Sequence, residues 1–224
     1  MEFLEKRQMT LTQFIVDGKY VTPQTLKKLT LCKNLEELDV KGYPPKDLMA
    51  SVSNFHNLKI LTLNAVNTDG FNSLFSGNNF EHLTELNIDA HPNDNPSDTQ
   101  IEHCLNSKIS KFPNLKKLTL SRTPQLSNPD FKAKYYLKTI ALACPMLESI
   151  KIYQYKKGSG LIYLSKLNNL KYLHFNPSCS VLGNRDDDEQ RDILELRDEL
   201  TELLNTANSN LLGMLITKKL VTII

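Results

Sequence analysis

The stretch Leu35-Glu36-Glu37-Leu38-Asp39-Val40 contains the pattern that decides the fold, Leu-x-x-Leu-x-Leu. The same pattern recurs along the 224 residues, with an apolar side chain at each of its three marked places. Its copies begin at Leu35, Leu58, Leu83, Leu115, Leu147 and Leu170, and a weaker copy begins at Leu11. The steps between the first leucines are 24, 23, 25, 32, 32 and 23 residues, so we expect insertions after the fourth and fifth copies.

Each copy has the spacing of a short strand. The last two apolar positions are two residues apart and therefore lie on one face of a strand, which we expect to face the core. The intervening residues point the other way. The predicted outward positions are Gln13, Ile15, Asp17; Glu37, Asp39, Lys41; Ile60, Thr62, Asn64; Glu85, Asn87, Asp89; Lys117, Thr119, Ser121; Ser149, Lys151, Tyr153; and Tyr172, His174, Asn176.

The segments between the copies contain helix signals. Thr22 followed by Pro23 is typical of an N-cap and a first helical residue. Pro45 is expected to open a second helix, and Ser159 to cap a third over 160–167. Further helices are predicted over 70–75, 98–109, 128–143 and 189–205, and a degenerate eighth strand at Leu211, Met214 and Ile216.

Composition limits the classes of function. The net charge is +2, from 27 basic and 25 acidic residues, so we expect no global attraction to nucleic acid or to a membrane. The four cysteines form no CxxC pair, and no Asn-x-Ser/Thr acceptor occurs, which favours a reducing compartment, cytoplasmic or nuclear. Neither a signal peptide at the N-terminus nor an apolar stretch of membrane-spanning length is expected.

The repeats resemble those of leucine-rich-repeat proteins of the ribonuclease-inhibitor-like superfamily, whose periods lie in the twenties. They are most similar to the repeats of F-box/leucine-rich-repeat proteins. The resemblance covers about 11–175 and is carried by Cys144-Pro145-Met146-Leu147-Glu148-Ser149-Ile150-Lys151-Ile152, Pro113-Asn114-Leu115-Lys116-Lys117-Leu118-Thr119-Leu120 and Thr68-Asp69-Gly70-Phe71-Asn72-Ser73-Leu74.

The resemblance implies an α/β leucine-rich-repeat solenoid with a curved parallel sheet inside and helices outside. We expect one domain over 1–224, with about seven repeats in 11–180 and a C-terminal helix and cap in 185–224. The chain departs from the family in two ways. First, the position eight residues after each first leucine lacks the Asn or Cys that usually forms hydrogen bonds to the backbone of the turn, so these backbone groups must find other partners. Second, no F-box is expected before the first repeat.

The outward residues change in charge along the chain. The first four copies contribute Asp17, Glu37, Asp39, Glu85 and Asp89 against Lys41, whereas the later copies contribute Lys117, Lys151, Tyr153, Tyr172 and His174. We expect a concave surface with an acidic end and a basic, aromatic end that suits an acidic or phosphorylated peptide. The alternative is that these faces are polar only because they meet solvent.

Catalysis and metal binding have little support in the sequence. Adjacent His103 and Cys104 are poorly placed to form a nucleophile–base pair, and the histidines lack the spacing of zinc ligands. The acidic run 186–189 lacks the alternating ligands of a calcium loop. We therefore expect no enzyme, metal or cofactor, but a protein-recognition module. By resemblance, it would select substrates for a ubiquitin ligase and contact ligase subunits; the alternative is a free-standing adaptor or inhibitor.

Overall fold

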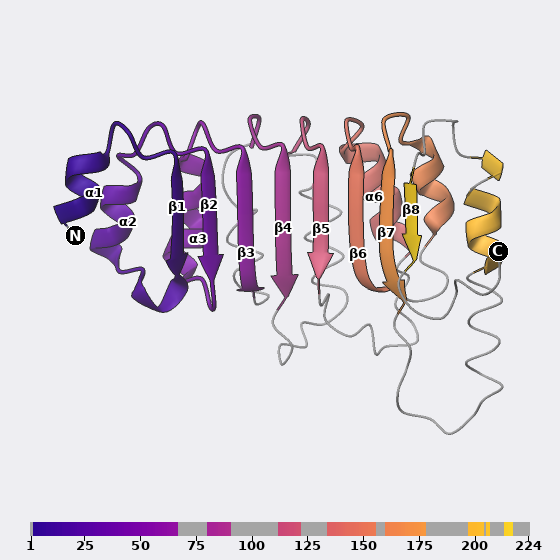
Figure 1. Ribbon diagram of the computed structural model, residues 1–224, viewed down its shortest axis with the longest axis horizontal. Helices are drawn as coiled ribbons and strands as arrows, with labels where there is room; N and C mark the ends of the chain where they lie inside the picture. The colour runs from indigo at the N-terminus through magenta and orange to yellow at the C-terminus, as the bar shows by residue number, and fades with distance from the viewer. Residues whose placement is uncertain are drawn as a thin grey trace, which may run out of the picture.

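The computed structural model of the chain describes residues 2–66, 80–90, 112–121, 134–155, 160–177, 197–203, 205–206 and 213–216. The fold is α/β, with eight parallel strands that lie side by side in the order of the chain (Figure 1). The strands are β1 Gln13–Asp17, β2 Glu37–Lys41, β3 Ile60–Val66, β4 Glu85–Ala90, β5 Lys117–Ser121, β6 Ser149–Tyr155, β7 Tyr172–Pro177 and β8 Gly213–Ile216. Because β1 and β8 are edge strands, the sheet is open.

The strands align at equivalent positions of the repeated motif. Glu37 of β2 pairs with Gln13 of β1 on one side and with Ile60 of β3 on the other. The same row of Cα partners continues through Glu85, Lys117, Ser149, Tyr172 and Gly213. Residues that are equivalent in sequence are therefore neighbours in space, and a difference between successive repeats becomes a difference between successive strands.

The predicted alternation is confirmed wherever side chains are described. Leu38 and Val40 are fully buried, and so are Leu61 and Leu63 in the next strand. The burial of each of these four aliphatic side chains stabilises the fold by about 1.5–3 kcal/mol. None of the predicted outward side chains that the structure describes is buried. The weaker first copy is also a strand, but its Phe14 and Val16 are only partly buried.

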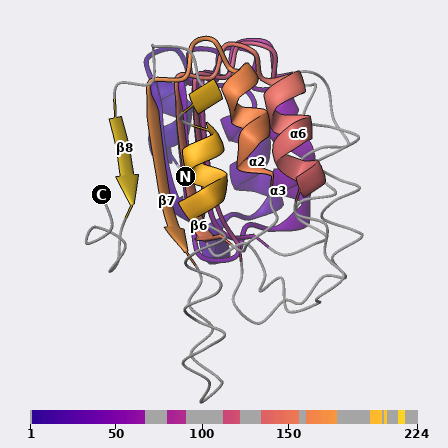
Figure 2. The same ribbon diagram turned by 90° about the vertical axis from the view of Figure 1, so that its right-hand side faces the viewer.

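The helices α2, α3 and α6 stand beside one another on one face of the sheet (Figure 2). We call the opposite face, which carries the outward residues, the open face. The labelled helices are α1 Glu2–Arg7, α2 Pro23–Leu29, α3 Lys46–Ser51 and α6 Lys134–Ala143, with 3-10 turns η1 Gly18–Tyr20, η2 Val52–Asn54 and η4 Leu161–Lys166. The predicted cap of α2 is confirmed, since the Thr22 hydroxyl accepts the Thr25 amide at 3.1 Å.

The turns before the strands are joined by asparagine side chains. Asn34, Asn57, Asn114 and Asn169 each stand directly before the first leucine of a motif. Each side-chain amide donates to a main-chain carbonyl in the preceding turn, with acceptors Met9, Lys33, Glu81 and Pro145 at 2.7, 2.7, 2.7 and 3.2 Å respectively. We call this row the asparagine ladder. The ladder satisfies carbonyls of the turns at the end of the sheet where the strands begin.

Several expected elements differ from the sequence prediction or lie outside the described residues. The expected helix over 160–167 is a 3-10 turn, and its N-cap is Gly160 at φ 74°, not Ser159. A left-handed backbone here favours glycine, which explains the shift. The eighth strand is confirmed, with Met214 paired to Leu173. Residues 197–203 are helical, as part of the expected 189–205 helix. The helix α1 was not predicted.

Other expectations fall outside the described residues: the helices over 70–75 and 98–109, the start of the 128–143 helix and both insertions. Within the described part of the chain, none of the helices has the length and apolar character needed to cross a bilayer.

Candidate functional site: the open face of the sheet

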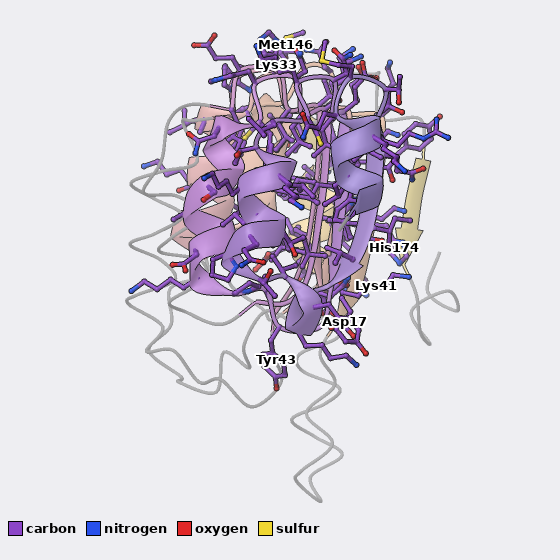
Figure 3. All side chains as sticks on the ribbon, turned by 90° about the vertical axis from the view of Figure 1, so that its left-hand side faces the viewer. Asp17, Lys33, Lys41, Tyr43, Met146 and His174 are labelled. Carbon is purple, nitrogen blue, oxygen red and sulfur yellow. The ribbon has the colours of Figure 1, made fainter. Side chains whose placement is uncertain are left out.

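The open face presents the predicted site residues in two rows across the strands. The first row contains Glu37, Glu85, Lys117 and Tyr172, and the second contains Asp39, Lys151 and His174. Figure 3 shows His174 on the side of the sheet away from the helices. Because these two rows are continuous from β2 to β7, the charge change seen in the sequence runs across the sheet. The register shifts only later, between Leu63 and Val66 of β3 and between Tyr153 and Tyr155 of β6.

Carboxylates dominate the open face at β2. Asp39 is half-buried, and its Oδ1 atom is buried with no hydrogen-bond partner in the described part of the structure. Burial raises the pKa of the Asp39 carboxyl, and Glu37 adds to this effect while the Lys41 ammonium opposes it. The surroundings of Asp39 therefore disfavour its ionised form.

A polar network joins the acidic and basic ends. The Lys117 ammonium lies 3.1 Å from Glu85 Oε2, and the Asn87 amide donates to Glu85 Oε1 at 3.1 Å and to the Thr62 hydroxyl at 3.2 Å. Burial acts to raise the pKa of Glu85, but hydrogen bonds from Asn87 and Lys117 and the charges of Lys117 and Lys151 lower it overall. The predicted binding cation Lys117 is thus engaged by an acidic residue from the neighbouring strand.

The basic, aromatic end lies on β6 and β7. Lys151 is exposed and is the Cα partner of His174. Burial, together with the Lys151 charge, lowers the pKa of His174 below its usual value, which favours the neutral imidazole. Tyr172 is 56% exposed. Lys151 has no carboxylate partner among the described residues.

Two predicted site residues lie apart from these groups. Asp89 is half-buried near the end of β4, where its Cα partner is Ser121. Tyr153 pairs with Asn176 through its main chain, and its side chain lies outside the described part of the structure. The open face therefore brings together Lys151, Tyr172 and His174 in one place and Glu37 with Asp39 in another.

The described residues include His, Cys, Asp and Glu side chains, the kinds that ligate metals or act as nucleophiles. No group of three or more His, Cys, Asp or Glu among them is arranged to hold a metal ion. Cys32 and Cys144 are buried and unpaired thiols, and burial raises the pKa of Cys144 to about 12. That thiol stays protonated at neutral pH and is a core side chain rather than a nucleophile.

Comparison with known proteins gives no identity. No protein-family model matches the chain, and no curated protein matches it either. The geometry and the charges of this chain therefore carry the functional inference.

The net charge of +2 conceals a strong segregation of basic and acidic residues along the chain, which the repeat motif does not reveal. Residues 103–185 contain fourteen Lys or Arg and only two acids, Asp130 and Glu148, and six of the eight tyrosines. The remaining residues contain thirteen basic and twenty-three acidic side chains. Counting charge over successive segments would have revealed this pattern. Because strand order follows chain order, β5, α6, β6, η4 and β7 lie together, and we call the described part of this segment the basic end. Strand β8 lies next to it at the edge of the sheet, and the described helical residues 197–203, with Asp198, Glu199 and Glu202, follow the basic end in the chain.

Proposed function

We propose that the chain is a non-catalytic leucine-rich-repeat module that recognises a protein through its open face. Three features support the repeat class: the Leu-x-x-Leu-x-Leu motif, the parallel strands in chain order, and the helix or turn segments between described strands. Such an array offers a broad surface whose outward residues vary without disturbing the buried leucines.

The observation that carries the proposed site is the exposed ring of Tyr172 beside Lys151 on the open face. A tyrosine buries a large area on binding with few rotatable bonds, so exposed tyrosines are frequent interface anchors. Lys151 supplies a cation that no described carboxylate neutralises. We propose an acidic or phosphorylated peptide segment as the bound element, because its anions would form charge-assisted bonds with Lys151.

The cellular role that the family resemblance favours is substrate selection for an F-box type ubiquitin ligase, in the cytoplasm or nucleus. In that role the open face would hold the substrate while ligase subunits assemble with the same protein. A free-standing adaptor or inhibitor would use the same face without ligase subunits. The two roles differ in the proteins that accompany the chain in cells.

Proximity labelling in cells tests both parts of the proposal. We expect the wild-type chain to label a partner that the double variant Lys151→Glu/Tyr172→Ala no longer labels, because the variant removes the cation and the ring together. Labelled ligase subunits that persist in the variant would support the ligase role. Their absence from the wild-type sample would favour the free-standing adaptor.

The matched control is Lys41→Glu/Ile15→Ala, which removes a lysine and a large exposed side chain from the open face at β1 and β2. This control variant should label the same partner as the wild-type chain. Equal labelling by both double variants, with melting curves like that of the wild type, would contradict the proposed site.

A further inference from the structure

The open face of strands β5 to β7 holds six side chains that can each donate a hydrogen bond. They lie in two rows of Cα partners, and each strand contributes one residue to each row. All six are exposed or half-buried, and none is a carboxylate. We call these residues the donor patch: Lys117, Ser149 and Tyr172 in the first row, and Thr119, Lys151 and His174 in the second.

Lys151 is the cation of the donor patch that remains available to a ligand. It is exposed, and its Cα partners are Thr119 on one side and His174 on the other. Among the described residues it forms no ion pair, whereas the Lys117 ammonium lies 3.1 Å from Glu85 Oε2. A ligand therefore meets one free ammonium group with neutral donors beside it.

The surroundings limit the width of the donor patch. On one side, Glu85 of β4 is the Cα partner of Lys117, and its carboxylate repels further anions. On the other side, β8 places Gly213 beside the first row and Leu215 beside the second, and neither residue is charged. The region suited to an anion thus covers three strands, about 10 Å across at the usual strand spacing. A ligand must concentrate its negative charge within that distance.

A phosphomonoester matches this arrangement better than a carboxylate does. It places a charge of about −1.5 to −2 on one side chain at pH 7 and has three strong acceptor oxygens. A carboxylate has one charge and two oxygens, which the three donors of the Lys151 ammonium can satisfy alone. The hydroxyls of Thr119 and Ser149 add donors that a third, charged oxygen can use, and such charge-assisted bonds are stronger than neutral ones.

We propose that the donor patch binds a phosphorylated side chain of the protein partner, with Lys151 on the phosphate and the Tyr172 ring against the adjoining residues of the partner. This inference rests on the proposed function, because it assigns the chemistry of the ligand at the same face. A run of Asp and Glu spreads its charges over several residues, so that few reach Lys151 while others approach Glu85. Recognition then depends on the phosphorylation state of the partner.

Four degenerate peptide libraries of equal length, followed by fluorescence anisotropy with the full-length chain, test the inference. Their central residue is phosphoserine, phosphotyrosine, Glu or Ser. A phosphorylated library should bind at least about tenfold more tightly than the Glu library, which is the effect of one additional charge-assisted hydrogen bond. Comparison of the two phosphorylated libraries identifies the side chain that carries the phosphate. Inorganic phosphate at equal concentration should not displace the peptides, because it makes no contact with the Tyr172 ring.

Removal of the neutral donors gives a sharper test than removal of the cation. Thr119→Ala/Ser149→Ala keeps every charge of the donor patch, so it should weaken binding of the phosphorylated library by about tenfold and leave the Glu library unchanged. The matched control, Thr62→Ala/Thr84→Ala, removes two half-buried hydroxyl side chains, one in β3 and one directly before β4. This control variant should bind both libraries like the wild-type chain.

The inference is overturned if no phosphorylated library binds, or if the Glu or Ser library binds as tightly as the phosphorylated ones. Equal losses for the phosphorylated and Glu libraries in Thr119→Ala/Ser149→Ala would also overturn it, and so would displacement by inorganic phosphate, since the ligand would then be a free anion. A labelled partner that requires Lys151 and Tyr172 but not phosphorylation would contradict this inference and keep the proposed function.

Discussion

Strands β1 to β4 and strands β5 to β7 are built on the same buried positions but carry different chemistry on their outer surfaces. Leu38 in β2 and Leu118 in β5 occupy equivalent places on the inner face, and both are buried. On the open face, β2 places Glu37 and Asp39 where β6 places Ser149 and Lys151. Strand alternation thus separates the residues that hold the fold from those free to differ between repeats.

The comparison also shows what controls the charge of each end. The described part of 2–90 has nine basic and ten acidic residues, so its charges nearly balance, whereas the described part of β5 to β7 and its helices has a clear excess of lysine. The ion pair between Glu85 and Lys117 stands where the two ends meet. We infer that binding specificity lies at the basic end, and that the other end mainly extends the array.

The largest expected effect tests whether the two ends share one frame. Leu38→Ala and Leu118→Ala should each lower the free energy of unfolding by about 2–5 kcal/mol, because each leaves a cavity in a packed core. Urea denaturation followed by circular dichroism measures the change. The neighbouring open-face change Thr119→Ala should stay within about 0.5 kcal/mol. A loss of stability in only one of the two leucine variants would mean that the two ends do not share a core.

The asparagine ladder should give a smaller effect that is equal at both ends. Asn57→Ala and Asn114→Ala should each lower the free energy of unfolding by about 1 kcal/mol, since each removes one hydrogen bond to a turn carbonyl. His82 stands directly before a first leucine, like the ladder asparagines, but has no described hydrogen bond there. An asparagine could make that bond, so His82→Asn should raise the free energy of unfolding by about 0.5–1.5 kcal/mol. Thermal denaturation compares the three variants. A neutral His82→Asn would show that the ladder is a consequence of the turns and does not stabilise them.

The smallest effects concern two open-face carboxyls whose pKa values shift in opposite directions. The pKa of Asp39 is raised above 3.8, so the free energy of unfolding falls as pH rises through that raised pKa. The pKa of Glu85 is lowered from 4.5, so its contribution is present above 4.5 and is lost as pH falls through the lowered pKa.

At pH 7, Asp39→Asn should therefore raise stability and Glu85→Gln should lower it, each by less than about 1 kcal/mol because both carboxyls are partly solvated. Urea denaturation at pH 7 and at about pH 3 measures both signs. High salt should diminish the Glu85 effect, since it weakens the ion pair with Lys117. Changes of the same sign in the free energy of unfolding of both variants would contradict the environments described for the two carboxyls.

The strands and their register could be predicted from the sequence because apolar spacing leaves little choice. A leucine two residues from another leucine points to the same side of a strand, and a displaced register would expose it. The same spacing fixed the open-face positions of Lys151, Tyr172 and His174. The degenerate eighth strand followed from Met214 and Ile216 in the same way.

The remaining features depend on contacts that spacing does not encode. The pair of Glu85 and Lys117 joins residues 32 positions apart, and only the register brings them together. The start of η4 depends on the left-handed backbone of Gly160, which the helix pattern alone did not reveal. The contact between the Lys138 ammonium and the Tyr163 ring could not be predicted, because these residues belong to different elements that meet only through packing.

Hydrogen exchange of the chain with and without its captured protein partner tests the central claim most directly. If the basic end of the open face is the binding surface, the amides of β6 and β7 should exchange more slowly in the complex. The amides of β1 and β2 should then be unchanged. Protection centred on β1 and β2, with β6 and β7 unaffected, would contradict the account.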